Sequence, residues 1–182
     1  MKQGAEIIQA AKTVAELDVL CSFAHSAKQN NYVRPVVTSS ATSFEIRSGR
    51  HPVVEKIQSD AGRLFTRNDC NLGAKPFALI TGVNMGGKST FLRQNALVAV
   101  MAQCGSFVPA DSANLGLLDA VYTRIGASDD LAKDRSTFML EMMETASILA
   151  NATDRSLVIM DEIGRGTAAE EGFALAWAIV DH

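Results

Sequence analysis

The stretch that decides the fold of this chain is PFALITGVNMGGKSTFLRQNALVAVMAQCG, residues 76–105. It begins with a short apolar run at 77–80, which predicts a buried strand, and it ends with a helical pattern that reaches Gly105. Between the two lies GVNMGGKS (82–89), which matches the G-x-x-x-x-G-K-[ST] pattern of a phosphate-binding P-loop in its required place between a strand and a helix. We therefore predict a nucleotide-binding site here.

Each residue type in this loop suits a phosphate for a different reason. Gly86 and Gly87 let backbone N–H groups curl around a β-phosphate, where a side chain would obstruct them. Lys88 supplies positive charge, the N-terminus of the helix adds its dipole, and Ser89 offers a hydroxyl to Mg²⁺. We predict Mg²⁺-dependent ATP binding, with these nucleotide-binding residues in the segment: Gly82, Val83, Asn84, Met85, Gly86, Gly87, Lys88, Ser89 and Thr90.

The composition predicts a soluble chain in a reducing compartment. Its 182 residues are 47% hydrophobic, which is ample for the core of one domain. The longest apolar stretch, 96–102, is too short to span a bilayer, and the N-terminus lacks the apolar core of a secretory signal. Three cysteines without metal-ligand spacing argue against a disulfide framework. We expect an intracellular protein with no membrane contact, cytoplasmic if bacterial and nuclear or mitochondrial if eukaryotic.

The charge balance argues against DNA binding through this segment. The net charge is −3 and the pI is near 5.6, whereas a grip on the phosphodiester backbone needs clustered Lys and Arg. Any nucleic-acid contact is expected elsewhere. The chain also stops at His182 inside an amphipathic run without a C-cap, which we interpret as the end of a fragment.

Residues 5–28 repeat apolar side chains at roughly helical spacing, which predicts one helix or a broken pair. The segment 30–35 breaks this pattern and behaves as a junction. Two interpretations stay open for this helix: an ordinary packing element, or a connector that arrives from a preceding domain.

Residues 36–80 are rich in β-forming side chains, and strands are predicted near 36–38, 44–46 and 52–54. His51 immediately precedes the last of these runs. A lone histidine beside a proline is more often a turn residue held by local hydrogen bonds than a ligand or a base, and we favour that interpretation.

Two later segments carry candidate chemistry. Ser136 or Thr137 is a natural N-cap for a helix at 138–150, although the same hydroxyl and N–H groups could bind an anion; the residues alone favour the simple cap. The run SLVIMDE (156–162) has the pattern of a central parallel strand that delivers two acids to the phosphate edge of a doubly wound sheet.

The two acids at the end of that strand have distinct predicted roles. Side chains alternate along a strand, so both carboxylates reach the nucleotide only if the chain leaves the pleat, which IGRG (163–166) allows. Asp161 would then hold Mg²⁺ together with Ser89, and Glu162 would polarise the attacking water.

The residues around both nucleotide motifs resemble the ATPase domain of the MutS family of DNA mismatch-repair proteins. The resemblance covers nearly the entire chain. It is carried by AELDVL (15–20), GRHPVVE (49–55), VNMGGKSTFLRQ (83–94), GSFVPA (105–110), TRIGASDDLAKDRSTFMLEM (123–142), ETASILANAT (144–153) and LVIMDEIGRGT (157–167).

This resemblance implies an α/β fold, a P-loop NTPase of ABC-ATPase type with a mainly parallel central sheet flanked by helices. Residues 1–30 would be the end of a helical lever, and residues 31–182 the ATPase domain, truncated at its C-terminal side. The domain would dimerise head to tail, so that Ser136 meets the γ-phosphate bound by the partner chain. Phe65 matches the family's aromatic that packs on adenine. The implied catalytic set is Glu162, Lys88 and Ser136.

The resemblance also implies partners. These are an identical or different MutS-family subunit, mismatched double-stranded DNA through domains outside this segment, and a MutL-like protein. The family's later histidine lies beyond His182, so we expect the isolated segment to be a weak or inactive ATPase.

The sequence departs from the family at two places. Val83 replaces a usual proline, which leaves the phosphate-cradling glycines intact. After Thr167 the family has small hydroxyl residues and then Asp-Gly, whereas this chain has AAEEG (168–172), which puts signalling across the dimer in doubt.

Two rival functions remain at this point. A transporter or chromosome-structure ATPase would carry Leu-Ser-Gly-Gly-Gln where this chain has DRSTF (134–138). A MutS-like protein acting in recombination or organelle genome maintenance would differ only in domains outside this segment.

Overall fold

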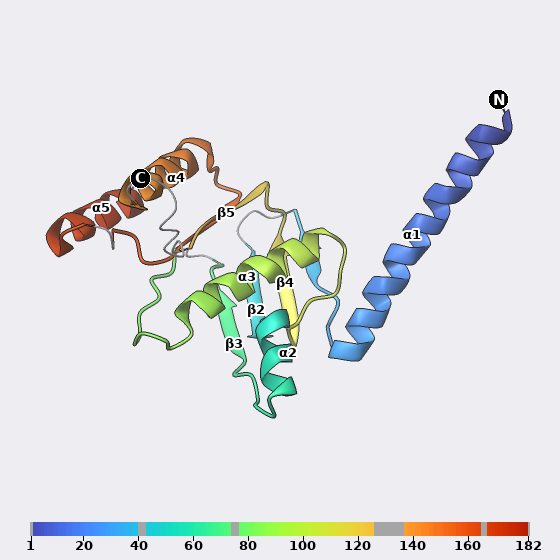
Figure 1. Ribbon diagram of the computed structural model, residues 1–182, viewed down its shortest axis with the longest axis horizontal. Coiled ribbons are helices and arrows are strands. Elements are labelled where there is room, and N and C mark those ends of the chain that lie inside the picture. Colours follow the sequence, from blue (N-terminus) through green and yellow to red (C-terminus); the bar gives the residue numbers. More distant parts are fainter. Residues whose placement is uncertain (1, 40–42, 74–76, 126–136, 165–166, 182) are drawn as a thin grey trace.

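The computed structural model describes residues 2–39, 43–73, 77–125, 137–164 and 167–181. Helices and strands follow one another in a mixed α/β order (Figure 1). Their bounds are α1 Lys2–Asn30, β1 Val36–Thr38, β2 Phe44–Gly49, α2 Pro52–Asp60, β3 Asn68–Asn71, α3 Lys88–Gln103, β4 Ser112–Gly116, β5 Ala120–Arg124, α4 Thr137–Asn151, β6 Ser156–Met160 and α5 Ala169–Asp181.

One sheet has four strands in the order β1-β4-β2-β3. β1 is parallel to β4, and β2 is antiparallel to both β4 and β3. α3 lies across this sheet (Figure 1), and its buried face combines three alanines and a valine with Gln94 and Asn95. The main core joins residues of β2, β3, β4, α3, β6 and the segment before β4: Phe44, Ile46, Cys70, Ala96, Val98, Ala99, Ala102, Val108, Ala110, Ala113, Leu115, Leu157 and Ile159.

The second sheet pairs β5 with β6 in parallel. Its register puts Ala120 beside Ser156 and Arg124 beside Met160, so that both strands end together. The next backbone N–H, that of Asp161, donates to the Arg124 carbonyl at 2.8 Å. α4 packs on β5, and α3 packs on β6.

The mixed α/β class is confirmed, but the predicted single, mainly parallel central sheet is not what the described residues form. They form two sheets, of which the larger is mixed. The predicted strand at 77–80 is not assigned as a strand, and Phe77 and Leu79 are exposed. A strand requires hydrogen-bonded neighbours, and within the described ranges no strand pairs with this run.

The strand predicted at 52–54 was also wrong, because this run forms the first turn of α2. His51 takes the N-cap position, and its Nδ1 accepts a hydrogen bond from the Val54 N–H at 3.3 Å. Pro52 follows at the first helical position, where its missing N–H and fixed φ favour a helix. Burial lowers the pKa of His51, which keeps the imidazole neutral and able to accept. The local, non-catalytic interpretation of His51 agrees with this geometry.

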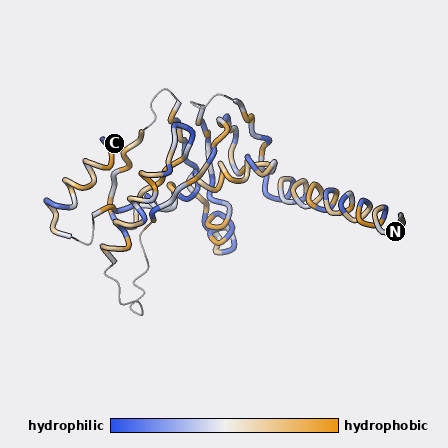
Figure 2. Tube along the Cα trace, turned by 90° about the horizontal axis from the view of Figure 1, so that it is seen from above, coloured by the Kyte–Doolittle hydropathy of each residue, from blue (hydrophilic) through white to orange (hydrophobic). Residues whose placement is uncertain are grey.

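α1 is one continuous helix that extends away from the rest of the chain (Figure 1). Apolar and polar residues mix along it (Figure 2), and Ile8, Leu17 and Leu20 are exposed. None of the helices in the described ranges has the length and apolar content that a membrane span needs.

A buried arginine fastens the C-terminus of α1 to the sheet domain. The Arg50 guanidinium donates to the carbonyls of Asn30 at 3.3 Å and Asn31 at 2.7 Å, and it pairs with Glu55 at 2.9 Å. It also lies 5.7 Å from the Tyr32 ring centroid. The last carbonyls of a helix lack partners within the helix and carry partial negative charge, so a cation here satisfies both needs.

Candidate functional site

The loop before α3 is shaped by glycine. Gly87 is the N-cap with φ of 88°, in the left-handed region that favours glycine. The Gly86 N–H donates to the Val83 carbonyl at 3.1 Å, and a Cβ on Gly86 would lie 2.9 Å from that same oxygen. No side chain caps the N-terminus of α3. This arrangement fits a polyphosphate, because the backbone turn is tight and the helix start is not blocked by a capping side chain.

Lys88 lies back over the loop. Its Nζ donates to the carbonyls of Gly82 at 2.8 Å and Val83 at 3.0 Å. Ser89 and Thr90 follow in the first turn of α3 and are partly buried, while Asn84 and Met85 are exposed at the loop tip. The ammonium group therefore lies against the backbone of the glycine loop.

The two acids after β6 occupy different environments. Asp161 is buried, whereas the exposed Glu162 has φ of 52°, so the chain leaves the extended conformation between them, as the sequence predicted. Gly164 follows with φ of 76°. The turn presents Glu162 to solvent at the edge of the β5–β6 sheet.

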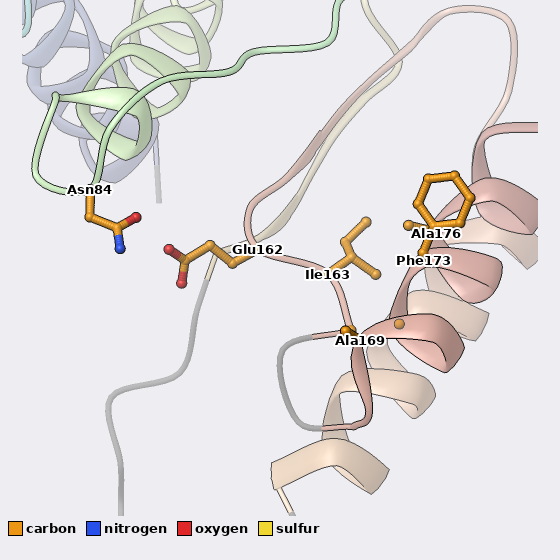
Figure 3. Close-up of a pocket in the computed structure, with 8 residues that line it drawn as sticks. Asn84, Glu162, Ile163, Ala169, Phe173 and Ala176 are labelled. Carbon is orange, nitrogen blue, oxygen red and sulfur yellow. The ribbon is translucent and has the colours of Figure 1, made fainter.

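A shallow pocket of about 490 Å³ joins the loop and the acids. In Figure 3 the Asn84 amide and the Glu162 carboxylate point toward one another across it. The opposite wall comes from α5 and the turn before it. The lining residues are Asn84, Glu162, Ile163, Gly164, Ala169, Gly172, Phe173 and Ala176.

The other predicted site residues lie outside this lining. Asp161 is buried directly after β6, and Ser89 lies on the first turn of α3. Phe65 is partly buried between α2 and β3. Ser136 lies outside the described residues.

The oxygen ligands that the protein offers would suit Mg²⁺ only if phosphate and water completed its coordination shell. In the described ranges no three His, Cys, Asp or Glu side chains gather as a metal site. Mg²⁺ commonly takes one or two protein oxygens and completes its shell with water and substrate phosphates. A hydroxyl from Ser89 and a carboxylate from Asp161 are a set of that kind, and this metal role stays a prediction.

Two glycines that the sequence analysis did not select form the tightest contact of the site. A Cβ on Gly172 would lie 2.7 Å from the Gly164 carbonyl oxygen, and a Cβ on Gly164 would lie 2.6 Å from the Gly172 Cα. The backbone of α5 thus rests directly on the turn that carries Glu162. The Thr167 hydroxyl donates to the Glu171 carboxylate at the start of α5. The only hint of this contact in the sequence was a pair of glycines eight positions apart, one on each side of the start of α5.

Gly172→Ala is expected to loosen α5. The added methyl must displace backbone, and such overpacking destabilises by about 1–3 kcal/mol. We expect amide hydrogen exchange in α5 to speed up accordingly in the full-length protein. Gly4→Ala in α1 is the matched control, because its Cβ would meet nothing within 4 Å and alanine favours a helix more than glycine does. Equal exchange in α5 of wild type and Gly172→Ala would contradict the contact.

Two buried charged residues, Arg124 and Glu141, were also missed. Arg124 ends β5, and Glu141 lies on α4 beside the turn. The only hint of their burial in the sequence was that each charge stands at a position of its strand or helix that would otherwise face the core. Local patterns predict such burial poorly, because it depends on the pairing of two distant segments.

Known proteins with similar sequences indicate the family of this chain. A family model described as MutS domain V matches residues 78–182. A "DNA mismatch repair protein MutS" of Dinoroseobacter shibae is 56% identical over 180 residues, which are 98% of this chain and 20% of that protein. Proteins with the same description from Cytophaga hutchinsonii and Nitrobacter winogradskyi are 56% and 52% identical over 97% and 100% of this chain. The chain spans about a fifth of the length of these curated relatives.

Proposed function

The chain belongs to the MutS family of DNA mismatch-repair proteins, and we propose that it is the ATP-binding and ATP-hydrolysing domain of such a protein. This membership sets aside the transporter and chromosome-structure alternative. The observation that carries the proposal is the pocket in which Asn84 of the glycine loop faces Glu162 of the turn after β6. A glycine-rich loop and an acid meet there although they are far apart in sequence.

The loop residues would bind the phosphates of ATP. Backbone N–H groups of 82–90 and the start of α3 attract the anion. Lys88 would exchange its bonds to the Gly82 and Val83 carbonyls for bonds to phosphate oxygens, which are stronger because both groups are charged. Ser89 and Asp161 would hold Mg²⁺, which supplies neutralising charge when bound. Phe65 would pack on the adenine ring.

Glu162 would act on water. Its carboxylate orients a water molecule toward the terminal phosphate and takes the proton as the new phosphorus–oxygen bond forms, leaving ADP and phosphate. The exposed position on the turn suits this role, since a base must reach solvent-derived water. Buried Asp161 suits a metal ligand better than a proton acceptor.

We further propose that the domain is of ABC type and acts in a dimer, with either an identical or a different MutS-family subunit. Residues 1–30 would be the end of a lever and residues 31–182 the ATPase domain. Ser136 of one subunit would contact the γ-phosphate held by the other. ATP-driven closure of the dimer would then change a DNA clamp that grips mismatched double-stranded DNA through domains outside this segment, and a MutL-like protein is a further proposed partner.

Mixing two inactive chains tests the shared site. Full-length Lys88→Ala and Ser136→Arg proteins are each expected to hydrolyse ATP poorly. A mixed dimer has one site with both halves intact and one site damaged twice, so mixing should restore at most about half of the wild-type turnover per dimer if the sites are independent. Each variant mixed with itself is the control.

Two results would overturn the shared site. One is a mixture that stays inactive although mixed dimers are shown to form by native mass measurement. The other is full activity of Ser136→Arg alone, which would make Ser136 only a helix cap.

A further inference from the structure

The turn that carries Glu162 is held at both ends by backbone N–H groups. At its start, the Asp161 N–H donates to the Arg124 carbonyl at 2.8 Å. At its end, the Gly164 N–H donates to Glu141 Oε1 at 2.7 Å, in a buried hydrogen bond. Glu162 and Ile163 span the distance between these two anchors. The first anchor comes from β5 and the second from the side chain of α4.

The Glu141 carboxylate is buried, and burying a charge costs free energy unless the charge is paired and hydrogen-bonded. The side chain of Glu141 is 6% exposed, and that of Arg124 is 8% exposed. Glu141 Oε2 lies 3.8 Å from Arg124 Nη2, and Arg124 Nη1 donates to the Ile125 carbonyl at 3.1 Å. A buried carboxylate requires charge pairing and hydrogen bonds, and here the Gly164 N–H supplies one of them.

The backbone of the turn needs such support. Glu162 has φ of 52° and Gly164 has φ of 76°, both in the left-handed region. A residue with a Cβ persists there only where its surroundings fix it. If the Gly164 N–H lost its acceptor, the turn could relax, and the direction of the Glu162 carboxylate would change with it.

We propose that Glu141 is a positioning residue for Glu162: it holds the Gly164 N–H and so keeps the Glu162 carboxylate aimed into the pocket beside Asn84. This rests on the proposed function, in which Glu162 acts on water. It also gives α4 a direct link to the hydrolytic group of its own subunit, because a shift of α4 moves one end of the turn.

The test replaces Glu141 in the full-length protein. Glu141→Leu removes the acceptor, and we expect kcat for ATP hydrolysis to fall roughly 10- to 100-fold, the scale on which displacing a reacting group by about 1 Å acts. The Kd for ATP should change by less than about 3-fold, since the loop that binds phosphate is untouched. Glu141→Gln keeps an oxygen that can accept from Gly164 and should retain most of kcat. Glu144→Gln, on the same helix and half exposed, removes a 3.1 Å ion pair with Arg124 but no bond to the turn. It is the control for the loss of a charge beside Arg124 and should retain most of kcat.

Amide hydrogen exchange gives a readout that does not depend on turnover. Exchange at the Gly164 N–H should rise by about 10-fold or more in Glu141→Leu and much less in Glu141→Gln. Glu141→Asp, whose shorter side chain cannot keep both the arginine and the N–H, should resemble Glu141→Leu and replaces it if that variant does not fold.

Several outcomes would overturn the proposal. One is a wild-type kcat in Glu141→Leu, or in Glu141→Asp if the Leu variant does not fold. Another is an equal loss of kcat and of ATP affinity, which would indicate a merely structural role. The third is an unchanged rate of exchange at the Gly164 N–H. A wild-type protein that binds ATP without hydrolysing it would overturn the proposed function and the role of Glu162 with it, whereas the exchange measurement would still report whether Glu141 holds the turn.

Discussion

Glu162→Gln is expected to leave ATP bound and to slow its hydrolysis by about 100-fold or more, the usual loss when a general base is removed. Gln keeps the size of the side chain and its place on the turn, but it cannot take a proton from water. The glycine loop before α3, Lys88 and Asp161 are unchanged in this variant. Single-turnover hydrolysis and equilibrium ATP binding of the full-length protein measure the two effects separately.

Glu170→Gln is the matched control for this experiment. Glu170 lies in the first turn of α5, is exposed, and does not line the pocket. Its replacement should leave both binding and hydrolysis at the wild-type level. A folded Glu162→Gln protein that fails to bind ATP would contradict the division of roles between Glu162 and the loop.

Lys88→Ala is expected to weaken ATP binding by about 100-fold or more, and hydrolysis should be lost with it. In this structure the ammonium group already bonds to the Gly82 and Val83 carbonyls, so it lies beside the loop without a rearrangement of the helix. Alanine removes the counter-charge to the phosphates and leaves the glycine turn in place. Titration with a fluorescent ATP analogue and a hydrolysis assay measure the loss.

Lys56→Ala, an exposed lysine on α2, is the control for the general loss of one positive charge. It should bind ATP as the wild type does. If Lys88→Ala retains wild-type affinity and turnover, the assignment of this loop as the nucleotide site is wrong.

Local chemistry explains what could be predicted from the sequence. The helix that starts at Lys88 and the strand at 156–160 were predicted because their apolar periods match one type of element. The left-handed Gly87 and the departure of the chain at Glu162 also follow from residue types within a few positions. The same reasoning failed at 52–54, where a β-branched run is overridden by the His51 cap and Pro52.

Pairing between distant segments explains the rest. The predicted single parallel sheet was wrong for the described residues because strand order depends on partners that no local pattern specifies. Asp161 and Glu162 could be selected from the sequence, but the hydrogen bonds that hold their turn could not. The bond from Gly164 to Glu141 joins residues 23 positions apart, and it exists only because α4 packs beside the turn.

The sequence by itself determined the family, the glycine loop before α3 and the acids after a strand, because glycine conformations, helix starts and apolar periods are properties of short segments. Only the tertiary structure decided that Asn84 faces Glu162, that Gly164 touches Gly172, and that buried Glu141 holds the turn. The physical reason is that the burial of a charge and the close approach of two backbones depend on which segments meet in space. Hydrophobic burial brings those segments together, and their polar groups must then find partners.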